Sequence, residues 1–186
     1  MIQISEAFAR AANPYLKGHG FSIQPGMAAG CEYFSGGFSA PEPAFLTKEE
    51  LAALALLYGF DLVTQNPDRL PSRPNCGMQG STLIAFDFDQ CFSFLYLFIQ
   101  LGQPWEVSRH GIAPKHFGHL RLKNSSNPIN WTENVNAVVS LLDGLDALTS
   151  WISDDWVDNA EKIKAHLGEI RDHLGAFEME LQGSLR

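Results

Sequence analysis

The sequence predicts a mainly α-helical protein with a small β-hairpin. Residues 51–65 are almost continuously apolar, which favours a buried helix. Residues 132–148 and 153–174 carry apolar side chains three to four positions apart, which is typical of helices packed on a core. Residues 75–81 contain two glycines and separate two short apolar runs, a pattern that indicates a hairpin turn.

The chain of 186 residues is long enough for one domain with a proper core. We expect two parts: a short N-terminal helix with a hinge-like loop over residues 1–46, and a helical domain over residues 47–186. Net charge is −8, which disfavours non-specific nucleic-acid binding because that needs clustered Lys and Arg. The one basic stretch, residues 109–123, is expected to be a solvated loop or a local positive patch.

No secretory leader and no membrane span are expected, because the longest apolar run, residues 92–101, is too short to cross a bilayer. Cys31, Cys76 and Cys91 show no paired spacing, which favours a reducing cytoplasm over a disulfide framework. The sequence therefore indicates a cytoplasmic protein.

The N-terminal part is expected to begin with a helix over residues 4–18 that starts at Ser5. Pro14 lacks a backbone N–H and would break this helix near Asn13. Short strands are expected at residues 21–23 and 32–34. The rest of residues 24–46 is rich in Gly, Pro, Ala and Ser, which predicts a flexible loop.

The helix over residues 51–65 has a strong start signal. Thr47 can cap it, and Glu50 three residues later can return the hydrogen bond. This helix would lead directly into a polar loop at residues 66–69. After the hairpin, residues 92–101 are expected to form a buried helix that ends at Gly102.

Residues 103–131 are expected to be irregular. Three histidines lie in this segment: His110, His116 and His119. A helix would place His116 and His119 on one face, where they could bind one metal ion. Gly111, Pro114 and Gly118 argue against such a helix. A last helix is expected to start at residues 153–155, where acidic side chains suit the helix dipole.

The candidate site lies around the hairpin. Asp68 follows the helix, Asn75 opens the glycine-containing turn, and Asp87 ends the apolar strand at residues 83–86. Phosphoryl transfer uses this set: one carboxylate orients the attacking hydroxyl, while an amide oxygen and a second carboxylate hold Mg²⁺. Asp89 would share a face with Asp87 if the strand continued, and a cation between them would relieve their repulsion. The same residues are also ordinary turn formers, which leaves a purely structural interpretation open.

Three short motifs follow one another in this region: N-x-D-R, then P-N, then a strand that ends in Asp. They are Asn66-Pro67-Asp68-Arg69, Pro74-Asn75 and Phe86-Asp87. This order resembles the catalytic segment of the HipA-like kinases. The resemblance implies that residues 47–186 form a kinase-like C-terminal lobe that uses Mg²⁺ and ATP to phosphorylate a Ser or Thr of a protein. Asp68, with Arg69, would be catalytic. The implied cofactor-binding residues are Asn66, Asn75 and Asp87, and the implied metal ligands are Asn75, Asp87 and Asp89.

The resemblance is weaker elsewhere. Trp156 and the helix after it resemble the family's closing helix, and residues 6–23 resemble the helix that enters its hinge. Leu70 departs from the family, which often has His or Thr there. The sequence has no Gly-rich phosphate loop and no strand lysine for the phosphates.

Three functions are therefore considered. The first is the protein kinase activity. The second is a non-catalytic pseudokinase or split-kinase module that binds a partner lobe or an antitoxin-like protein. The third is a small-molecule phosphotransferase, since those enzymes share the loop Asp, the Asn and the strand Asp.

Overall fold

The computed structural model describes residues 2–17, 22, 24–28, 47–96, 102–125, 128–142 and 157–186. The chain divides into two compact units, residues 1–37 and residues 38–186, which we describe separately. Helices dominate the described residues, with two small antiparallel sheets of two strands each. The predicted secondary-structure content, mainly α-helix with a small β-hairpin, is confirmed.

The first unit is a helix between two short paired strands. β1 (Ile2–Ile4) pairs antiparallel with β2 (Gly26–Ala28), and α1 (Glu6–Leu16) lies between them in the sequence. The Ser5 side chain caps α1 by accepting a hydrogen bond from the Phe8 N–H at 3.1 Å, as predicted.

The predicted break near Asn13 is wrong, because α1 continues through Pro14. Proline removes one N–H from the helix ladder here, close to the helix end, and the Lys17 N–H still reaches the Asn13 carbonyl. The strand expected at residues 21–23 is not found at Ser22; Phe21, Ile23 and the expected strand at residues 32–34 lie outside the described residues.

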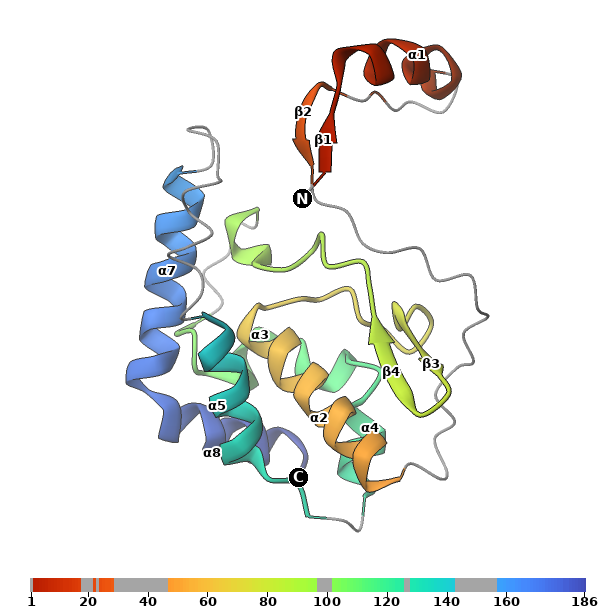
Figure 1. The fold of residues 1–186 in the computed structure, drawn as a ribbon. Coiled ribbons are helices and arrows are strands. Elements are labelled where there is room, and N and C mark those ends of the chain that lie inside the picture. The colour runs from red at the N-terminus through yellow and green to blue at the C-terminus, as the bar shows by residue number, and fades with distance from the viewer. Residues whose placement is uncertain are drawn as a thin grey trace. The chain divides into compact units, whose positions relative to one another are not determined.

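Helix α2 (Lys48–Val63) is central to the second unit. Its N-terminus carries the predicted capping box: the Glu50 N–H donates to Thr47 Oγ1 at 3.2 Å, and the Thr47 N–H donates to Glu50 Oε2 at 2.8 Å. Figure 1 shows α2 between the β3–β4 hairpin on one side and α5 on the other, and it contacts both. The expectation of a buried helix is confirmed.

The hairpin consists of β3 (Cys76–Gln79) and β4 (Thr82–Ala85), paired antiparallel. The turn itself is only Gly80-Ser81, and Gly80 has a φ of 62°. The expectation that residues 75–81 all form the turn is therefore wrong: Gly77 lies in β3 and pairs with Ile84. A two-residue turn with a left-handed first residue matches the twist of the strands, which leaves the preceding residues free to pair.

The helix expected over residues 92–101 is not found in its described part, where Ser93–Leu95 forms a single 3₁₀ turn. Phe92 precedes it with a φ of 57°, and a left-handed residue cannot lie inside an α-helix. Residues 97–101 lie outside the described residues.

Residues 103–131 contain short helical segments rather than purely irregular structure. These are α3 (Val107–His110), a 3₁₀ turn at Ala113–Lys115 and α4 (His119–Lys123). Gly111, with a φ of 66°, ends α3, and Gly118 precedes α4. These residues therefore divide the segment into short turns, as their types suggest.

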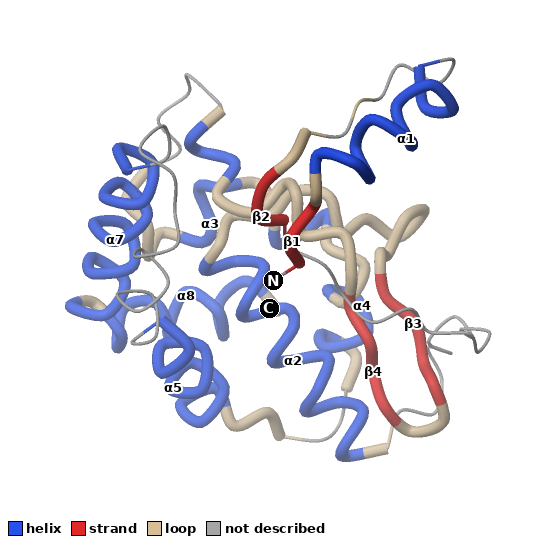
Figure 2. The backbone as a smooth tube through the Cα atoms, turned by 45° about the horizontal axis from the view of Figure 1, so that its top comes forward, coloured by secondary structure: helices blue, strands red, loops and turns tan. Residues whose placement is uncertain are grey.

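Among the described residues, the second unit has three further long helices, which Figure 2 shows in blue: α5 (Trp131–Leu142), α7 (Val157–Asp172) and α8 (Leu174–Ser184). The sequence pattern predicts a last helix that runs through Leu174, but the helix is interrupted at His173, whose φ and ψ are −119° and 30°. The interruption lets α8 contact both α3 and α5. Residues 143–156, including the expected helix start, lie outside the described residues.

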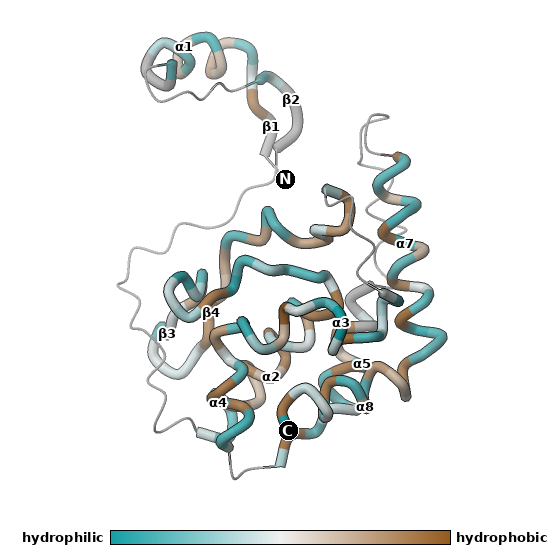
Figure 3. Tube along the Cα trace, turned by 180° about the vertical axis from the view of Figure 1, so that it is seen from behind, coloured by the Kyte–Doolittle hydropathy of each residue, from teal (hydrophilic) through white to brown (hydrophobic). Residues whose placement is uncertain are grey.

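The core of the second unit forms where α2, α5, α7 and α8 meet. Figure 3 shows hydrophobic and hydrophilic residues alternating along α7, as expected for a helix with one side on the core. None of the described helices combines the length and the hydrophobicity that crossing a membrane requires. Fully buried apolar side chains of this core include Tyr58, Leu62, Val63, Val107, Ile170, Phe177 and Leu181.

Candidate functional site

A buried carboxylate, Asp61, anchors the loop that follows α2. It accepts hydrogen bonds from the Asn66 side chain at 2.9 Å, from Arg69 Nε at 2.5 Å and from His116 Nε2 at 2.9 Å. Asp61 and Asn66 are 0% exposed and Arg69 is 1% exposed. A buried carboxylate requires such partners, because unpaired it would lose its hydration without compensation. The loop conformation is therefore fixed from inside the core.

His116 contributes to this network as a neutral side chain. The Gly118 N–H donates to His116 Nδ1 at 2.9 Å, so Nε2 carries the proton and donates to Asp61. Burial lowers the pKa of His116, although the hydrogen bond to Asp61 opposes this shift. The charge that balances Asp61 therefore comes from Arg69.

Arg69 also ties the loop to both strands of the hairpin. Its Nη1 donates to the backbone carbonyls of Pro74, Asn75 and Phe86 at 3.2, 2.6 and 3.3 Å. The Phe86 N–H donates to the Asn75 carbonyl at 3.0 Å, and the Arg69 guanidinium lies 4.9 Å from the centre of the Phe88 ring. These bonds set the positions of the backbone immediately beside Asn75 and Asp87.

Three carboxylates converge at this end of the hairpin. One oxygen each of Asp68, Asp87 and Asp89 lie within 4.8 Å of one another. Asn75 Nδ2 donates to Asp68 Oδ2 at 3.0 Å, and Arg73 forms an ion pair with Asp68 Oδ1. Asp68 is partly buried, whereas Asp87 and Asp89 are exposed. We call Asp68, Asn75, Asp87 and Asp89 the oxygen cluster.

Two residues of the cluster, Asn75 and Asp87, have backbone conformations that L-residues rarely adopt. Among the described residues, the non-glycine positions with positive φ are Gln65, Asn75, Asp87 and Phe92, with φ from 46° to 60°. Asn and Asp tolerate this region better than other residues, and Phe does not. Such conformations persist where surrounding contacts impose them, and they are common at functional sites.

The structure brings together four of the predicted site residues: Asp68, Asn75, Asp87 and Asp89. Asp87 and Asp89 would share a face only if the strand continued, and it does not, because β4 ends at Ala85. The backbone leaves the strand with Asp87 at a φ of 60°, and both carboxylates reach the cluster from the segment that follows β4.

The other two predicted residues have different surroundings. The Asn66 amide bonds to Asp61, and its carbonyl oxygen accepts the Asp68 N–H at 3.1 Å. Arg69 is buried and directed at Asp61 and backbone carbonyls. Both residues therefore hold the loop, and neither presents an exposed side chain to a ligand.

Sequence reasoning missed Asp61, Arg73 and the role of His116. A signal for Asp61 was available, because it is the acidic residue within the apolar run of residues 51–65. A charge inside a buried helix needs a partner, and Arg69 is the first cationic side chain after it.

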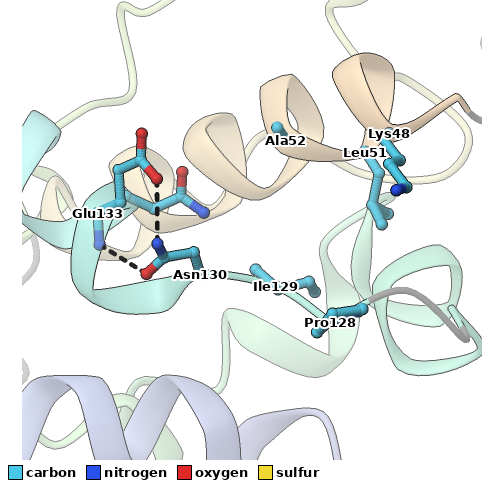
Figure 4. Close-up of a pocket in the computed structure, with 8 residues that line it drawn as sticks. Lys48, Leu51, Ala52, Pro128, Ile129, Asn130 and Glu133 are labelled. Atoms are coloured by element: carbon cyan, nitrogen blue, oxygen red, sulfur yellow. Dashed lines mark hydrogen bonds between the residues drawn. The ribbon is translucent and has the colours of Figure 1, made fainter.

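Two of the pockets lined by described residues of the second unit lie along α2. An apolar pocket of about 250 Å³ is lined by α2, β4 and Val138 and includes Phe88, the residue between Asp87 and Asp89. The second, of about 330 Å³, lies at the first turns of α2 and α5 (Figure 4), where Asn130 and Glu133 bond reciprocally. The oxygen cluster follows the other end of α2, roughly 24 Å away along a 16-residue helix.

Comparison of the chain with protein-family models, with curated proteins and with solved structures found no match in any of the three. The geometry of the oxygen cluster and the sequence pattern around it are therefore the basis for assigning a function.

Proposed function

We propose that residues 47–186 form a kinase-like lobe for Mg²⁺- and ATP-dependent phosphoryl transfer to a Ser or Thr hydroxyl of a protein, of the HipA-like type. One observation carries the proposal. Asp68 comes from the loop after α2, and Asp87 and Asp89 come from the segment after β4, about twenty positions later, yet one oxygen of each lies within 4.8 Å of the others.

The donor set fits Mg²⁺, because carboxylate and amide oxygens are the hard ligands that this ion prefers. Asn75, Asp87 and Asp89 would hold the ion. The Asn75 amide nitrogen donates to Asp68, which leaves the amide oxygen as its ligand atom. Bound Mg²⁺ would neutralise negative charge on the phosphate oxygens.

Asp68 is assigned to the attacking hydroxyl. Its carboxylate would accept the hydroxyl proton while the hydroxyl oxygen bonds to the γ-phosphorus and the bond to the leaving ADP oxygen breaks. Asn66 and Arg69 would act as positioning residues. Asn66 holds the Asp68 backbone, and Arg69 holds the carbonyls of Asn75 and Phe86.

Thermal unfolding with Mg²⁺ and ATP tests the proposal. A ligand that binds only the folded state, at a hundred times its dissociation constant, adds about 2.7 kcal/mol of stability. We expect a Mg²⁺-dependent rise in Tm for the wild type and none for Asp87→Asn. Asp172→Asn, at an exposed position at the end of α7, is the matched control and should behave as the wild type. A shift that persists in a folded Asp87→Asn protein would refute the assignment.

A second candidate is a non-catalytic or split-kinase module that binds a protein partner. It is favoured by the sequence, which contains no Gly-rich phosphate loop and no lysine between Lys48 and Lys115. This candidate predicts no Mg²⁺-dependent shift with ATP for the chain alone, and a shift once a lobe that binds phosphate is added. A neighbouring reading frame encoding such a lobe would support it.

A further inference from the structure

Residues 64–92, all of which the structure describes, contain two cationic side chains, Arg69 and Arg73. Arg69 is 1% exposed and is directed at Asp61 and three backbone carbonyls. The Arg73 side chain is 62% exposed and forms an ion pair with Asp68. Of these two cations, Arg73 is the one that a ligand at the oxygen cluster can reach.

The backbone of Arg73 is held in place although its side chain is exposed. The Leu70 N–H donates to the Arg73 carbonyl at 3.1 Å, and the Arg73 N–H donates to the Leu70 carbonyl at 3.0 Å. This reciprocal pair closes a tight turn around Pro71 and Ser72. Pro71 and Pro74 further restrict the segment, because each fixes its own φ. The guanidinium can therefore change partner without any movement of the loop.

The chemistry of the proposed function requires a cation besides Mg²⁺ on the phosphate oxygens, and the sequence offers no strand lysine for this task. A guanidinium presents donors in a planar fork that matches phosphate and carboxylate oxygens alike. We propose that Arg73 is the phosphate-binding cation of this site: it pairs with Asp68 while the site is empty and transfers to the phosphate oxygens when a Mg²⁺-bound phosphate chain binds. This inference rests on the proposed function.

The transfer would also free Asp68 Oδ1, which is the Arg73 partner. Asp68 Oδ2 would keep its bond from Asn75, so the carboxylate would stay in position. Occupation of the phosphate position would then expose the catalytic carboxylate to the incoming hydroxyl. The alternative is that Arg73 only holds Asp68 in place, and the two readings predict different binding behaviour.

Calorimetric titration of the full chain distinguishes a phosphate-binding Arg73 from an Arg73 that only holds Asp68 in place. The probes are Mg²⁺ alone and tripolyphosphate with saturating Mg²⁺, because tripolyphosphate needs no nucleoside pocket. The variants are Arg73→Ala and Arg73→Lys. The matched control is Arg109→Ala, since Arg109 is 67% exposed and pairs with Glu106 at 3.3 Å, outside the oxygen cluster.

We expect Arg73→Ala to bind Mg²⁺ at least as tightly as the wild type, because a positive charge beside the carboxylates is removed. Its affinity for tripolyphosphate should fall on the order of tenfold or more, as expected for a lost charge-assisted hydrogen bond. Arg73→Lys should recover part of that affinity, and Arg109→Ala should match the wild type.

Equal tripolyphosphate affinity in Arg73→Ala and the wild type would overturn the inference. Loss of both Mg²⁺ and tripolyphosphate binding in Arg73→Ala would also overturn it, because Arg73 would then only organise Asp68. Mg²⁺ binding by the wild type without tripolyphosphate binding would reject the role of Arg73 and leave the metal site standing. Absence of Mg²⁺ binding in the wild type would instead reject the proposed function, and this inference with it.

Discussion

Arg69 Nη1 donates to the backbone carbonyl of Asn75 at 2.6 Å, which joins the loop after α2 to the start of the hairpin. The same guanidinium bonds through Nε to Asp61, inside α2. A rigid helix therefore sets the position of a loop and a strand end through one buried side chain. This connection explains how Asn75, Asp87 and Asp89, which follow Asp68 by seven to twenty-one positions, come to lie beside it.

The first prediction concerns this buried pair. Asp61→Asn should lower the free energy of unfolding by about 3 to 5 kcal/mol, because it leaves the Arg69 charge buried without its partner. Chemical denaturation followed by circular dichroism measures this. Asp172→Asn removes an exposed acid and should change the stability little.

Replacing both partners supplies a second arm of this experiment. The double variant Asp61→Leu with Arg69→Met removes both charges and should be less destabilised than the sum of the single changes. Additive losses would contradict direct coupling between Asp61 and Arg69.

The second prediction concerns the left-handed backbone of Asn75, whose φ is 46°. Asn75→Ala should be less stable than Asn75→Gly by about 1 kcal/mol, since an L-residue with a Cβ pays for this conformation and glycine does not. Both variants lose the amide, so the Mg²⁺-dependent Tm shift should disappear from both. Equal stability of the two variants would mean that the left-handed conformation is absent in solution.

The third prediction concerns His166, a buried residue of α7 whose Nε2 lies 2.7 Å from the Val63 carbonyl at the end of α2. Burial lowers the pKa of His166 from 6.5 to about 4, although this hydrogen bond opposes the shift. The unfolded chain therefore binds this proton more readily than the folded chain does. The contribution of neutral His166 to the free energy of unfolding is fully present above about pH 6.5 and is lost as the pH falls toward about 4.

Between about pH 7 and pH 5 this group should contribute a loss of about 2 kcal/mol. Chemical denaturation at both pH values measures it. His166→Gln can still donate to Val63 but does not titrate, so its pH dependence should be smaller by that amount. The pKa values of His110, His116 and His119 are also lowered. The wild type and His166→Gln both contain these residues, so their effect cancels when the two pH dependences are compared. An unchanged pH dependence in the variant would show that His166 is not buried as a neutral side chain.

Several elements could be predicted from the sequence because their signals are local. The capping box at Thr47 and Glu50, the Ser5 cap and the Gly80 turn each depend on residues within a few positions of one another. The buried character of α2 was equally predictable, since its apolar run leaves no polar face.

The errors occurred where contacts distant in sequence outweigh local preference. Phe92 has a left-handed backbone, and its N–H donates to the Thr64 carbonyl at 2.5 Å, 28 positions earlier. The apolar pattern of residues 92–101 does not indicate that hydrogen bond, because its acceptor lies in another part of the chain. Likewise, the split between α7 and α8 at His173 is accompanied by contacts of α8 with α3 and α5.

The same distinction between local signals and contacts distant in sequence applies to the oxygen cluster. The oxygen-bearing residues and their order along the chain are visible in the amino-acid sequence, because side-chain chemistry and motif spacing are local properties. The convergence of Asp68, Asp87 and Asp89, and the pairing of Arg73 with Asp68, arise from the folded arrangement. That arrangement depends on Asp61 and Arg69, a charge pair whose partners meet when the core forms around them.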